Sequence, residues 1–470
     1  MKPARTNLAG WAALAAIALA IAVVSIGYWP GIMIDDARWQ YQQAVDNAYE
    51  DWHPPLMAWI WRRLMFMHPG PGPMLLLQLA LLWGGLALIS WWAIRKGQPR
   101  LALAVALAAW LPAPLALAGT VTKDCLMAGA LMTATGLALT RDFAGTKVQR
   151  VALTIAAAFF IVFAAALRLN AVFACVPLLL AILPRLLTRT KPRLLASGLV
   201  AAIALLAVGP AINAALHAED TDVDLSLIIF DLGGITEHSD VSVFPDLGVP
   251  DPVATNHRCY DPVGWDSYSS WAKIPCPLGF VPFQNKKDED DLSPVRIWLT
   301  AIIQHPFSYA EHRLTHFNLA TAFLANNRPD FTAWSQSAPN PWGYVVSSRA
   351  IIPVLTTLAN RSVETPIGWP IFWISVALAA AVAAAMERAT PVVIALACSA
   401  SVYGLSYLFV GVAVGMRYQF WTISGGAVAA VLVIAELMSR TEFPAAESLR
   451  IPALIVVVPT LLAILARTPL

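Results

Sequence analysis

The feature that most constrains this chain is a series of long apolar stretches. A helix needs about 20 predominantly apolar residues to cross the roughly 30 Å hydrocarbon core of a bilayer. Of the 470 residues, 58% are hydrophobic and only 13% are charged, which excludes a soluble protein. The candidate stretches are 8–28, 74–94, 101–119, 125–140, 151–167, 171–184, 194–216, 367–386, 391–414, 418–438 and 451–466. We therefore predict an all-α polytopic membrane protein with about eleven transmembrane helices, within a range of about 10 to 13.

Two stretches leave this number open. The stretch 171–184 is short for a span, and the further stretch 343–359 is interrupted by Arg349, so that it either crosses the membrane or does not. If 343–359 crosses, every later loop changes sides, Arg417 included. The first stretch follows Lys2 and Arg5, as in a signal peptide, but its length favours a retained anchor.

The lysine and arginine residues of the short loops predict the orientation in the membrane. One side holds Lys2, Arg5, Arg95, Lys96, Arg100, Arg141, Lys147, Arg150, Arg185, Arg189, Lys191 and Arg193. The opposite side holds Arg38, Arg62, Arg63, Lys123 and Arg168. Because basic loops tend to stay in the cytoplasm, the N-terminus is predicted inside, and the loops 29–73 and 217–366 face outward. The most fitting location is a bacterial inner membrane, crossed many times, with these loops in the periplasm.

The chain is thereby divided into three parts. Residues 1–216 form an N-terminal transmembrane module that contains the first outer loop, 217–366 form an outer loop domain, and 367–470 form the C-terminal transmembrane helices. The loop domain is rich in Pro, Gly and Asp, which predicts irregular structure with short helices. Within it, 225–236 and the two halves of 295–324, split at His305-Pro306, are predicted as interfacial helices beside the membrane.

Charge and cysteine content exclude two function classes. The 31 basic and 29 acidic residues nearly balance, and no long basic run is present, so nucleic acid is not an expected partner. No Cys-x-x-Cys motif occurs, which argues against a thiolate metal site or a redox motif. Cys259 and Cys276 lie 17 positions apart in the outer loop, where they form a disulfide or remain free thiols.

The first outer loop carries an acidic pair, Asp35-Asp36, about six residues past the first stretch and therefore near the headgroup level. There a carboxylate can face both water and a lipid-borne substrate. The alternative is that the pair caps a helix over 37–48, because an Asp before an apolar-periodic run is an ordinary N-cap. His53-Pro54-Pro55 then starts a Trp-rich amphipathic segment.

The other outer loops of the first half are very short, yet they carry charges. Lys123 and Asp124 lie between the third and fourth stretches, and Arg168 lies between the fifth and sixth. Because the sixth stretch is short, Arg168 is predicted at the hydrocarbon edge, where a charge costs roughly 2.5 to 3.5 kcal/mol. Either these side chains pair with each other and reach toward the headgroups, or they gather with Asp36 and a histidine as a site for an anionic lipid phosphate.

Several motifs, taken in their order, resemble the bacterial GT-C class of integral membrane glycosyltransferases, to which the protein O-mannosyltransferases and the lipid A aminoarabinose transferase are related. They are PGIMIDDARWQ in the first outer loop, DWHPPL after it, TKD at 122–124, RLN at 168–170, WLTAIIQHPFSYAEHR at 298–313 and GMRYQFW at 415–421. Together they extend over nearly the whole chain.

This resemblance implies a GT-C-like fold and transfer of a sugar from a polyprenyl-phosphate donor, with inversion at the anomeric carbon. The acceptor is a glycan, a lipid or a protein of the cell envelope. By position in the motifs the catalytic base is Asp36, with Asp35 as the second choice. The implied donor-phosphate ligands are Arg168, Lys123, Arg417 and Arg313. The implied substrate-binding residues are His53, Asp124, Gln40, Asn170 and Tyr418.

No metal is expected to be required, although a divalent cation is possible because Asp35, Asp36, His53 and Asp124 could supply ligands. His312 and His316 stand at i and i+4, as in some zinc sites, but they lack an evident third ligand, and a plain helix face is the alternative. Two other functions remain open: a transporter or flippase of a polyprenyl-linked glycan, and a non-catalytic subunit of envelope assembly. Charges grouped at stretch ends, rather than in their middles, favour the transferase.

Overall fold

A computed structural model describes residues 8–325, 333–347, 349–440 and 446–468. The contacts divide the chain into two compact units. We call residues 1–219, 332–405 and 416–461 the membrane unit, and residues 220–331, 406–415 and 462–470 the loop unit. This division differs from the predicted boundaries at 217 and 367, because the polar segment after 332 packs with the N-terminal helices rather than with the rest of the outer loop. The described residues contain helices and three isolated β-bridges but no strand.

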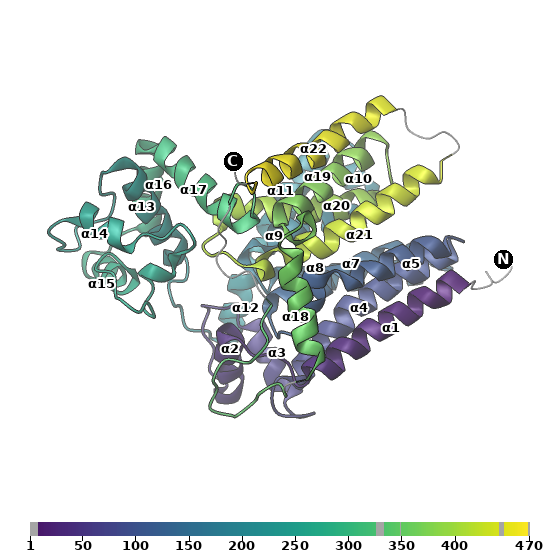
Figure 1. The fold of residues 1–470 in the computed structure, drawn as a ribbon, viewed down its shortest axis with the longest axis horizontal. Helices are drawn as coiled ribbons and strands as arrows, with labels where there is room; N and C mark the ends of the chain where they lie inside the picture. Colours follow the sequence, from purple (N-terminus) through teal and green to yellow (C-terminus); the bar gives the residue numbers. More distant parts are fainter. Residues whose placement is uncertain (1–7, 326–332, 348, 441–445, 469–470) are drawn as a thin grey trace. The chain divides into compact units, whose positions relative to one another are not determined.

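The membrane unit combines long helices with shorter ones (Figure 1). Its helices are α1 (Leu8–Tyr28), α2 (Asp35–Asp46), α3 (Leu56–Leu64), α4 (Gly72–Arg95), α5 (Pro99–Leu107), α6 (Pro112–Leu117), α7 (Lys123–Thr140), α8 (Lys147–Ala165), α9 (Val172–Ile182), α10 (Arg185–Thr188), α11 (Lys191–Leu206), α12 (Val208–Leu216), α18 (Ile351–Ser362), α19 (Pro370–Met386) and α21 (Phe420–Met438). Two further helices, α20 (Pro391–Val410) and α22 (Ala446–Leu465), begin in this unit and end in the loop unit.

Seven helical stretches among the described residues are long and apolar enough to cross a membrane. They are Leu8–Tyr28, Gly72–Arg95, Lys147–Ala165, Lys191–Leu216, Pro391–Val410, Met416–Met438 and Glu447–Leu465. Three shorter apolar helices lie at Pro99–Trp110, Leu169–Ile182 and Pro370–Met386. The all-α membrane fold is thus confirmed, whereas the number eleven is not.

Two predicted stretches differ from continuous spans, each for a local reason. The stretch 101–119 is divided at Pro112, which starts α6 after the short 3-10 helix Ala108–Trp110. In the stretch 343–359 the described residues are helical only from 351 onward, where the 12-residue helix α18 begins. At 1.5 Å per residue such a helix is about 18 Å long, too short to cross about 30 Å of hydrocarbon.

Glycines bring α4 and α7 unusually close together. A Cβ atom on Gly85 would lie 2.5 Å from the backbone of Met132 and Thr133, and one on Gly136 would lie 2.9 Å from the carbonyl oxygen of Gly85. The Thr133 hydroxyl donates to the carbonyl of Leu81 at 2.6 Å across the same contact. Small residues at a crossing are a common way to pack helices in lipid, where apolar burial gives little drive. This contact fixes α7 on α4.

The loop unit is built around α13 (Leu225–Ser239), which packs against α14 (Pro252–Cys259), α15 (Phe280–Asp290), α16 (Pro294–Gln304) and α17 (Pro306–Thr321). The prediction of an interfacial helix at 225–236 was wrong, because most of α13 is buried inside the unit. The prediction of two helices in 295–324 is confirmed, and the break lies at His305.

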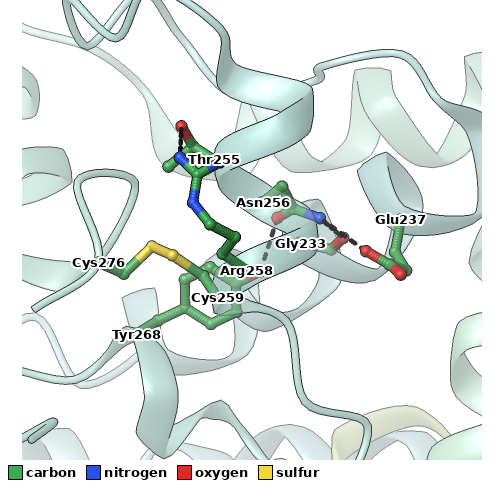
Figure 2. The surroundings of a disulfide bond; sticks show 8 residues. All are labelled: Gly233, Glu237, Thr255, Asn256, Arg258, Cys259, Tyr268 and Cys276. Carbon is green, nitrogen blue, oxygen red and sulfur yellow. Dashed lines mark hydrogen bonds between the residues drawn. A yellow bond between two sulfur atoms is a disulfide. The ribbon is translucent and has the colours of Figure 1, made fainter. Parts of the chain in front are cut away.

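A disulfide joins Cys259 at the end of α14 to Cys276, so the open question about these cysteines is decided in favour of the bridge (Figure 2). Nearby, the Tyr268 hydroxyl donates to the Asn256 side chain at 2.6 Å, and the Asn256 amide donates to the carbonyl of Gly233 at 3.0 Å. These contacts hold the loop after α14 on α13. The remaining cysteines, Cys125, Cys175 and Cys398, are free thiols.

Candidate functional site

Backbone hydrogen bonds join the first outer loop to the short loop before α7. The Ile32 N–H donates to the carbonyl of Gly119 at 3.0 Å, and the Ile32 carbonyl accepts from the N–H of Val121 at 2.9 Å. The two bonds make an isolated parallel β-bridge between Ile32 and Thr120. Each loop leads within a few residues into a helix, so this bridge sets the first turns of α2 and α7 near each other.

The two carboxylates of the acidic pair occupy different surroundings. Asp35 and Asp36 are the first two residues of α2, and the N-cap position belongs to Ile34, whose backbone is extended. Neither Asp is the N-cap, so the capping alternative does not apply. The Asp35 side chain is 78% exposed and pairs with Arg38 at 3.2 Å. The Asp36 side chain is only 23% exposed, which makes it the carboxylate of the pair that lies inside a site.

Asp36 is held by a guanidinium from the other end of the chain. Arg417, in the 3-10 helix Met416–Gln419, places Nη1 2.7 Å from Asp36 Oδ2. The Nη2 of Arg417 donates to the Tyr418 hydroxyl at 2.9 Å. Burial alone would raise the pKa of Asp36, but the charges of Arg417 and Lys123 outweigh it and hold this pKa below its usual range. Asp36 is therefore ionised at neutral pH.

His53 lies between Asp36 and Lys123 and is neutral. Its Nδ1 is 2.6 Å from Lys123 Nζ, and its Nε2 is 4.0 Å from Asp36 Oδ2. Because an ammonium group can only donate, Nδ1 must accept, which puts the ring proton on Nε2, toward Asp36. Burial and the charge of Lys123 lower the pKa of His53 to about 3. The imidazole thus carries no charge at neutral pH.

Arg168 is bound to the residue next to Lys123. Its Nη1 forms an ion pair with Asp124 Oδ1, and its Nε donates to the Asn170 side chain at 3.1 Å. The guanidinium carbon lies 5.2 Å from the centre of the Tyr418 ring, and that of Arg417 lies 4.8 Å from the same centre. One tyrosine ring therefore holds two guanidinium groups near each other.

We call this group of side chains the cationic cluster. It comprises Asp36, His53, Lys123, Asp124, Arg168, Arg417 and Tyr418. With a neutral histidine, its three cations face two carboxylates, so its net charge is about +1 at neutral pH. All members belong to the membrane unit. Sequence reasoning proposed every one of them, and the structure brings them together.

A carboxylate oxygen in the cluster and an amide oxygen beside it are buried without a hydrogen-bond partner among the described residues. They are Asp124 Oδ2 and Gln40 Oε1. The Gln40 amide donates to the backbone carbonyl of Asp36 at 3.3 Å, which places this predicted substrate ligand on α2 beside the cluster. Buried acceptors are normally satisfied, so these two oxygens are suited to hydroxyl or amide donors of a bound molecule.

The segment 334–342, which sequence reasoning did not include in the site, lies against α2 and the cationic cluster. The N–H of Ala338 donates to the carbonyl of Met33 at 2.7 Å, and Tyr41 packs edge-on against Trp342 at 4.7 Å between ring centres. At the start of the segment the Trp334 ring centre lies 5.8 Å from the guanidinium carbon of Arg417. Only its Trp and Tyr content marks this stretch in the sequence, and aromatic residues are common in any outer loop of a membrane protein.

The predicted phosphate ligand Arg313 belongs to the loop unit instead. Its side chain is 2% exposed, with Nη2 2.6 Å from Asp231 Oδ1 and Nη1 donating to the carbonyl of Gly411 at 2.6 Å. Trp298 Nε1 donates to the other Asp231 oxygen at 2.7 Å. Arg313 thus has its partners within the loop unit, whereas all members of the cationic cluster lie in the membrane unit.

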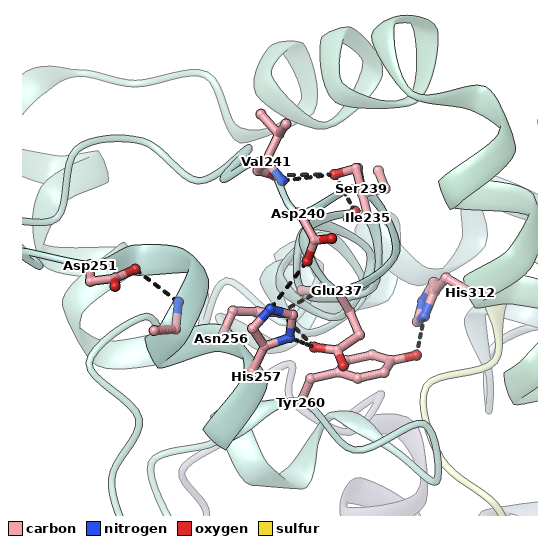
Figure 3. Close-up of polar contacts among 12 residues, drawn as sticks. Ile235, Glu237, Ser239, Asp240, Val241, Asp251, Asn256, His257, Tyr260 and His312 are labelled. Carbon is pink, nitrogen blue, oxygen red and sulfur yellow. Dashed lines mark hydrogen bonds and ion pairs between the residues drawn. The ribbon is translucent and has the colours of Figure 1, made fainter.

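The two histidines considered for zinc lie in the same core. His312 Nε2 is 3.2 Å from Asp231 Oδ1, and its Nδ1 is 2.9 Å from the Tyr260 hydroxyl (Figure 3). His316 Nδ1 donates to the carbonyl of Pro262 at 2.9 Å. A Cβ atom on Gly234 would lie 2.0 Å from His312 Nδ1, so only a glycine on α13 admits this ring. The i, i+4 spacing serves the packing of α17 on α13.

The side chains of the cationic cluster do not fit a divalent cation. Both carboxylates are paired with arginine, and the unprotonated ring nitrogen of His53 already accepts a hydrogen bond from Lys123. Three nearby positive charges would repel a further cation. Across the described residues no group of three or more His, Cys, Asp or Glu side chains is arranged to hold a metal ion.

Sequence comparisons give no relative for this chain: no family model matches it, and no curated protein sequence matches it.

Comparison with solved structures finds several likenesses. One is ArnT from Cupriavidus metallidurans bound to undecaprenyl phosphate, with 15% identity and a TM-score of 0.35 over 91% of this chain and 79% of that one. Another is the oligosaccharyltransferase AglB from Archaeoglobus fulgidus in complex with an inhibitory peptide and a dolichol-phosphate, with 12% identity and a TM-score of 0.38 over 97% of this chain and 55% of that one. The apo form of the same oligosaccharyltransferase gives 12% identity and a TM-score of 0.41, over 98% and 56%.

These likenesses have narrow limits. ArnT and AglB are both GT-C glycosyltransferases, the class that the sequence motifs resemble. The chain spans little more than half the length of the oligosaccharyltransferase. Because all these TM-scores lie below 0.5, the likenesses decide neither the fold nor the function of this chain.

Proposed function

We propose that this protein is an inverting glycosyltransferase that moves a sugar from a polyprenyl-phosphate donor to an envelope acceptor at the periplasmic face of a bacterial inner membrane. The observation that carries the proposal is the cationic cluster. It combines one accessible carboxylate, Asp36, with three cations on short loops at the ends of apolar helices. Cations in such a position suit a lipid-borne phosphate.

The charge of the cluster matches this donor before and after transfer. A polyprenyl phospho-sugar is a phosphodiester with one negative charge, which balances a net cluster charge of about +1. Transfer releases a phosphate monoester with about two negative charges at neutral pH, while the base takes up a proton and becomes neutral. The cluster charge then rises to about +2, so the balance is kept through the reaction.

The reaction is a single displacement. An acceptor oxygen attacks the anomeric carbon of the sugar, and the bond from that carbon to the phosphate oxygen breaks. The electron pair of the broken bond stays on the phosphate, where Arg168, Lys123 and Arg417 stabilise it. The acceptor proton passes to the Asp36 carboxylate, and the configuration inverts because only one displacement occurs. A phosphate leaving group needs cations rather than a second carboxylic acid.

Asp36 becomes a better base when the donor is bound. In the cluster as it stands, Arg417 lowers the proton affinity of the carboxylate. A phosphate that shares the Arg417 guanidinium offsets part of this positive field, so the pKa of Asp36 rises toward its ordinary value. The neutral His53, with its proton toward Asp36, helps to keep that carboxylate in place. Asp35, exposed and paired with Arg38, is the weaker candidate for this role.

The disulfide between Cys259 and Cys276 favours the outward orientation of the loop unit, because disulfides persist outside the cytoplasm. A transporter or flippase of a lipid-linked glycan is a less fitting function, since the charges cluster at helix ends rather than along a path through the membrane. A non-catalytic assembly subunit would not need an accessible carboxylate among three cations.

The test is release of polyprenyl phosphate from a polyprenyl phospho-sugar whose sugar is radiolabelled, with purified protein in lipid nanodiscs and an envelope extract as the acceptor source. We expect release in proportion to protein, with the label transferred to the acceptor, and none with Asp36→Asn. Movement of intact donor across liposomes without cleavage would point to a flippase. Neither cleavage nor movement, with well-folded protein and several donor sugars, would remove the proposal.

A further inference from the structure

A buried glutamine in a membrane helix holds the short loop that precedes Lys123. Gln78 lies on α4, the first helix after the outer loop, and is 1% exposed. Its amide donates to the carbonyls of Ala118 and Thr120, each at 2.9 Å. Its carbonyl oxygen accepts from the N–H of Thr122 at 3.4 Å. One side chain thereby binds three backbone groups of a five-residue loop.

Two of these groups belong to residues that position parts of the cluster. Thr122 is the N-cap of α7 and its hydroxyl accepts from the N–H of Cys125 at 3.2 Å, so its position sets where Lys123 and Asp124 begin the helix. Thr120 is the partner of Ile32 in the β-bridge that attaches the first outer loop. Gln78 therefore forms hydrogen bonds with the N-cap residue before Lys123 and with the bridge partner of the loop that leads to Asp36. It forms no hydrogen bond with the side chain of Lys123 or Asp36.

We propose that Gln78 is a positioning residue, which holds the loops of Lys123 and Asp36 in register so that the cluster can bind the phosphate of its lipid donor. This inference rests on the proposed function for its ligand. A polar side chain in the interior of a membrane helix is costly unless all its groups are bonded, and both amide hydrogens and the oxygen of Gln78 have partners. The two carbonyls and one N–H that it binds are just as costly to leave unpaired.

Ser90 provides a matched control on the same helix. It is 0% exposed, and its hydroxyl donates to a backbone carbonyl, that of Ala102, at 3.2 Å. Its bond fastens α5 rather than the loops of the cluster. A loss of folding stability is expected from Gln78→Leu and, to a smaller degree, from Ser90→Ala. A loss of phosphate binding is expected from Gln78→Leu alone.

The first experiment measures the affinity of purified protein in nanodiscs for polyprenyl monophosphate, together with the thermal midpoint. We expect Gln78→Leu to weaken binding by about tenfold or more, because displacement of a ligand group by about 1 Å can cost as much as 100-fold. Gln78→Glu keeps the acceptor for Thr122 and should lie between Gln78→Leu and wild type. Ser90→Ala should bind as wild type does. Equal losses in Gln78→Leu and Ser90→Ala, or none in folded Gln78→Leu, would overturn the inference.

A second experiment does not depend on the ligand. Hydrogen exchange of the full chain should show faster exchange at both 30–34 and 118–124 in the Gln78→Glu variant, and at neither segment in Ser90→Ala. Unchanged exchange at either segment contradicts the positioning role. If wild type binds no polyprenyl phosphate while exchange responds as expected, the proposed donor fails and the structural role of Gln78 stands.

Discussion

The protein contains two Asp–Arg pairs with a histidine beside each, and they differ in what else surrounds them. In the loop unit, Asp231, Arg313 and His312 are 0 to 2% exposed, and the partners of Asp231 and Arg313 include the Trp298 side chain and the Gly411 carbonyl. In the cationic cluster, Asp36 and Arg417 retain 23% and 14% exposure.

The difference lies in charge balance and access rather than in residue type. The loop-unit pair is one carboxylate with one guanidinium, closed off from solvent and bonded on several sides. The cationic cluster has a surplus positive charge and partial access to solvent. The first pair can hold a fold together, whereas the second can also exchange its partners for those of a ligand.

The largest effect is expected from removing the charge of Asp36. Asp36→Asn should lower turnover about 10²- to 10⁴-fold, the usual cost of losing a general base, while donor binding stays near that of wild type. The measurement is sugar transfer at saturating donor. Asp231→Asn serves as the comparison and should keep turnover per folded molecule. Retention of more than about a tenth of wild-type turnover in Asp36→Asn would move the role to another residue.

For the stability of the loop unit, the larger effect is expected from Asp231 rather than from Asp36. Asp231→Ala leaves Arg313 as an unpaired buried charge, which typically costs about 3 to 5 kcal/mol. Hydrogen exchange across α13 in the full chain should rise accordingly, and the loop unit should become sensitive to protease. Asp36→Ala should leave exchange at α13 unchanged. A larger loss of protection at α13 from Asp36→Ala than from Asp231→Ala would show that Asp231 is not the residue that stabilises the loop unit.

A smaller effect is expected at Arg168. Arg168→Ala should weaken binding of polyprenyl monophosphate by about 10- to 100-fold, since charge-assisted hydrogen bonds to phosphate are worth about 1.5 to 3 kcal/mol. Arg168→Lys should recover only part of this affinity, because an ammonium cannot make the two-pronged contact of a guanidinium. The alternative, in which Arg168 merely reaches toward lipid headgroups, predicts equal binding by all three proteins in a titration with labelled lipid.

The pH dependence of the core of the loop unit should follow its two buried histidines, His312 and His316. Burial lowers the pKa of His312, and it lowers the pKa of His316 to about 3, among neighbours that include Asp231 and Arg313. The unfolded chain binds these protons near pH 6.5 and the folded unit does not, so stability is lost as pH falls below about 6.5. For His316 the slope approaches about 1.4 kcal/mol per pH unit. Exchange at α13 between pH 7 and 5 measures it, and a His316→Gln variant should show a shallower slope.

The smallest effect is expected at Asp35. Asp35→Asn removes only an exposed ion pair with Arg38, which is worth about 0 to 1 kcal/mol. Turnover within about twofold of wild type is the expected result in the same transfer assay. A loss as large as that of Asp36→Asn would show that the two carboxylates act together.

Much of the fold follows from the sequence because apolar length alone marks a membrane helix. The division of 101–119 and the shortness of α18 could not be predicted, since apolar composition does not fix where a helix breaks. Asp36, His53, Lys123, Asp124 and Arg168 could be proposed from charged and polar residues next to apolar stretches, whereas Arg417 and Tyr418 were implied by the family resemblance. Their pairing could not, because Asp36 and Arg417 are 381 positions apart and no local pattern links them. Gln78 escaped notice for a related reason: its partners are backbone groups, which carry no residue signature.

We expect the cationic cluster, and not the loop-unit pair, to bind the lipid phosphate. The most direct measurement is the affinity of purified protein in nanodiscs for radiolabelled polyprenyl monophosphate, in wild type, Arg417→Ala and Arg313→Ala. Affinity is expressed per molecule that retains native exchange protection in the membrane unit. We expect Arg417→Ala to lose at least about tenfold in affinity and Arg313→Ala to bind as wild type does. Loss of binding in Arg313→Ala with full binding in Arg417→Ala would show that the loop-unit pair, and not the cationic cluster, binds the phosphate.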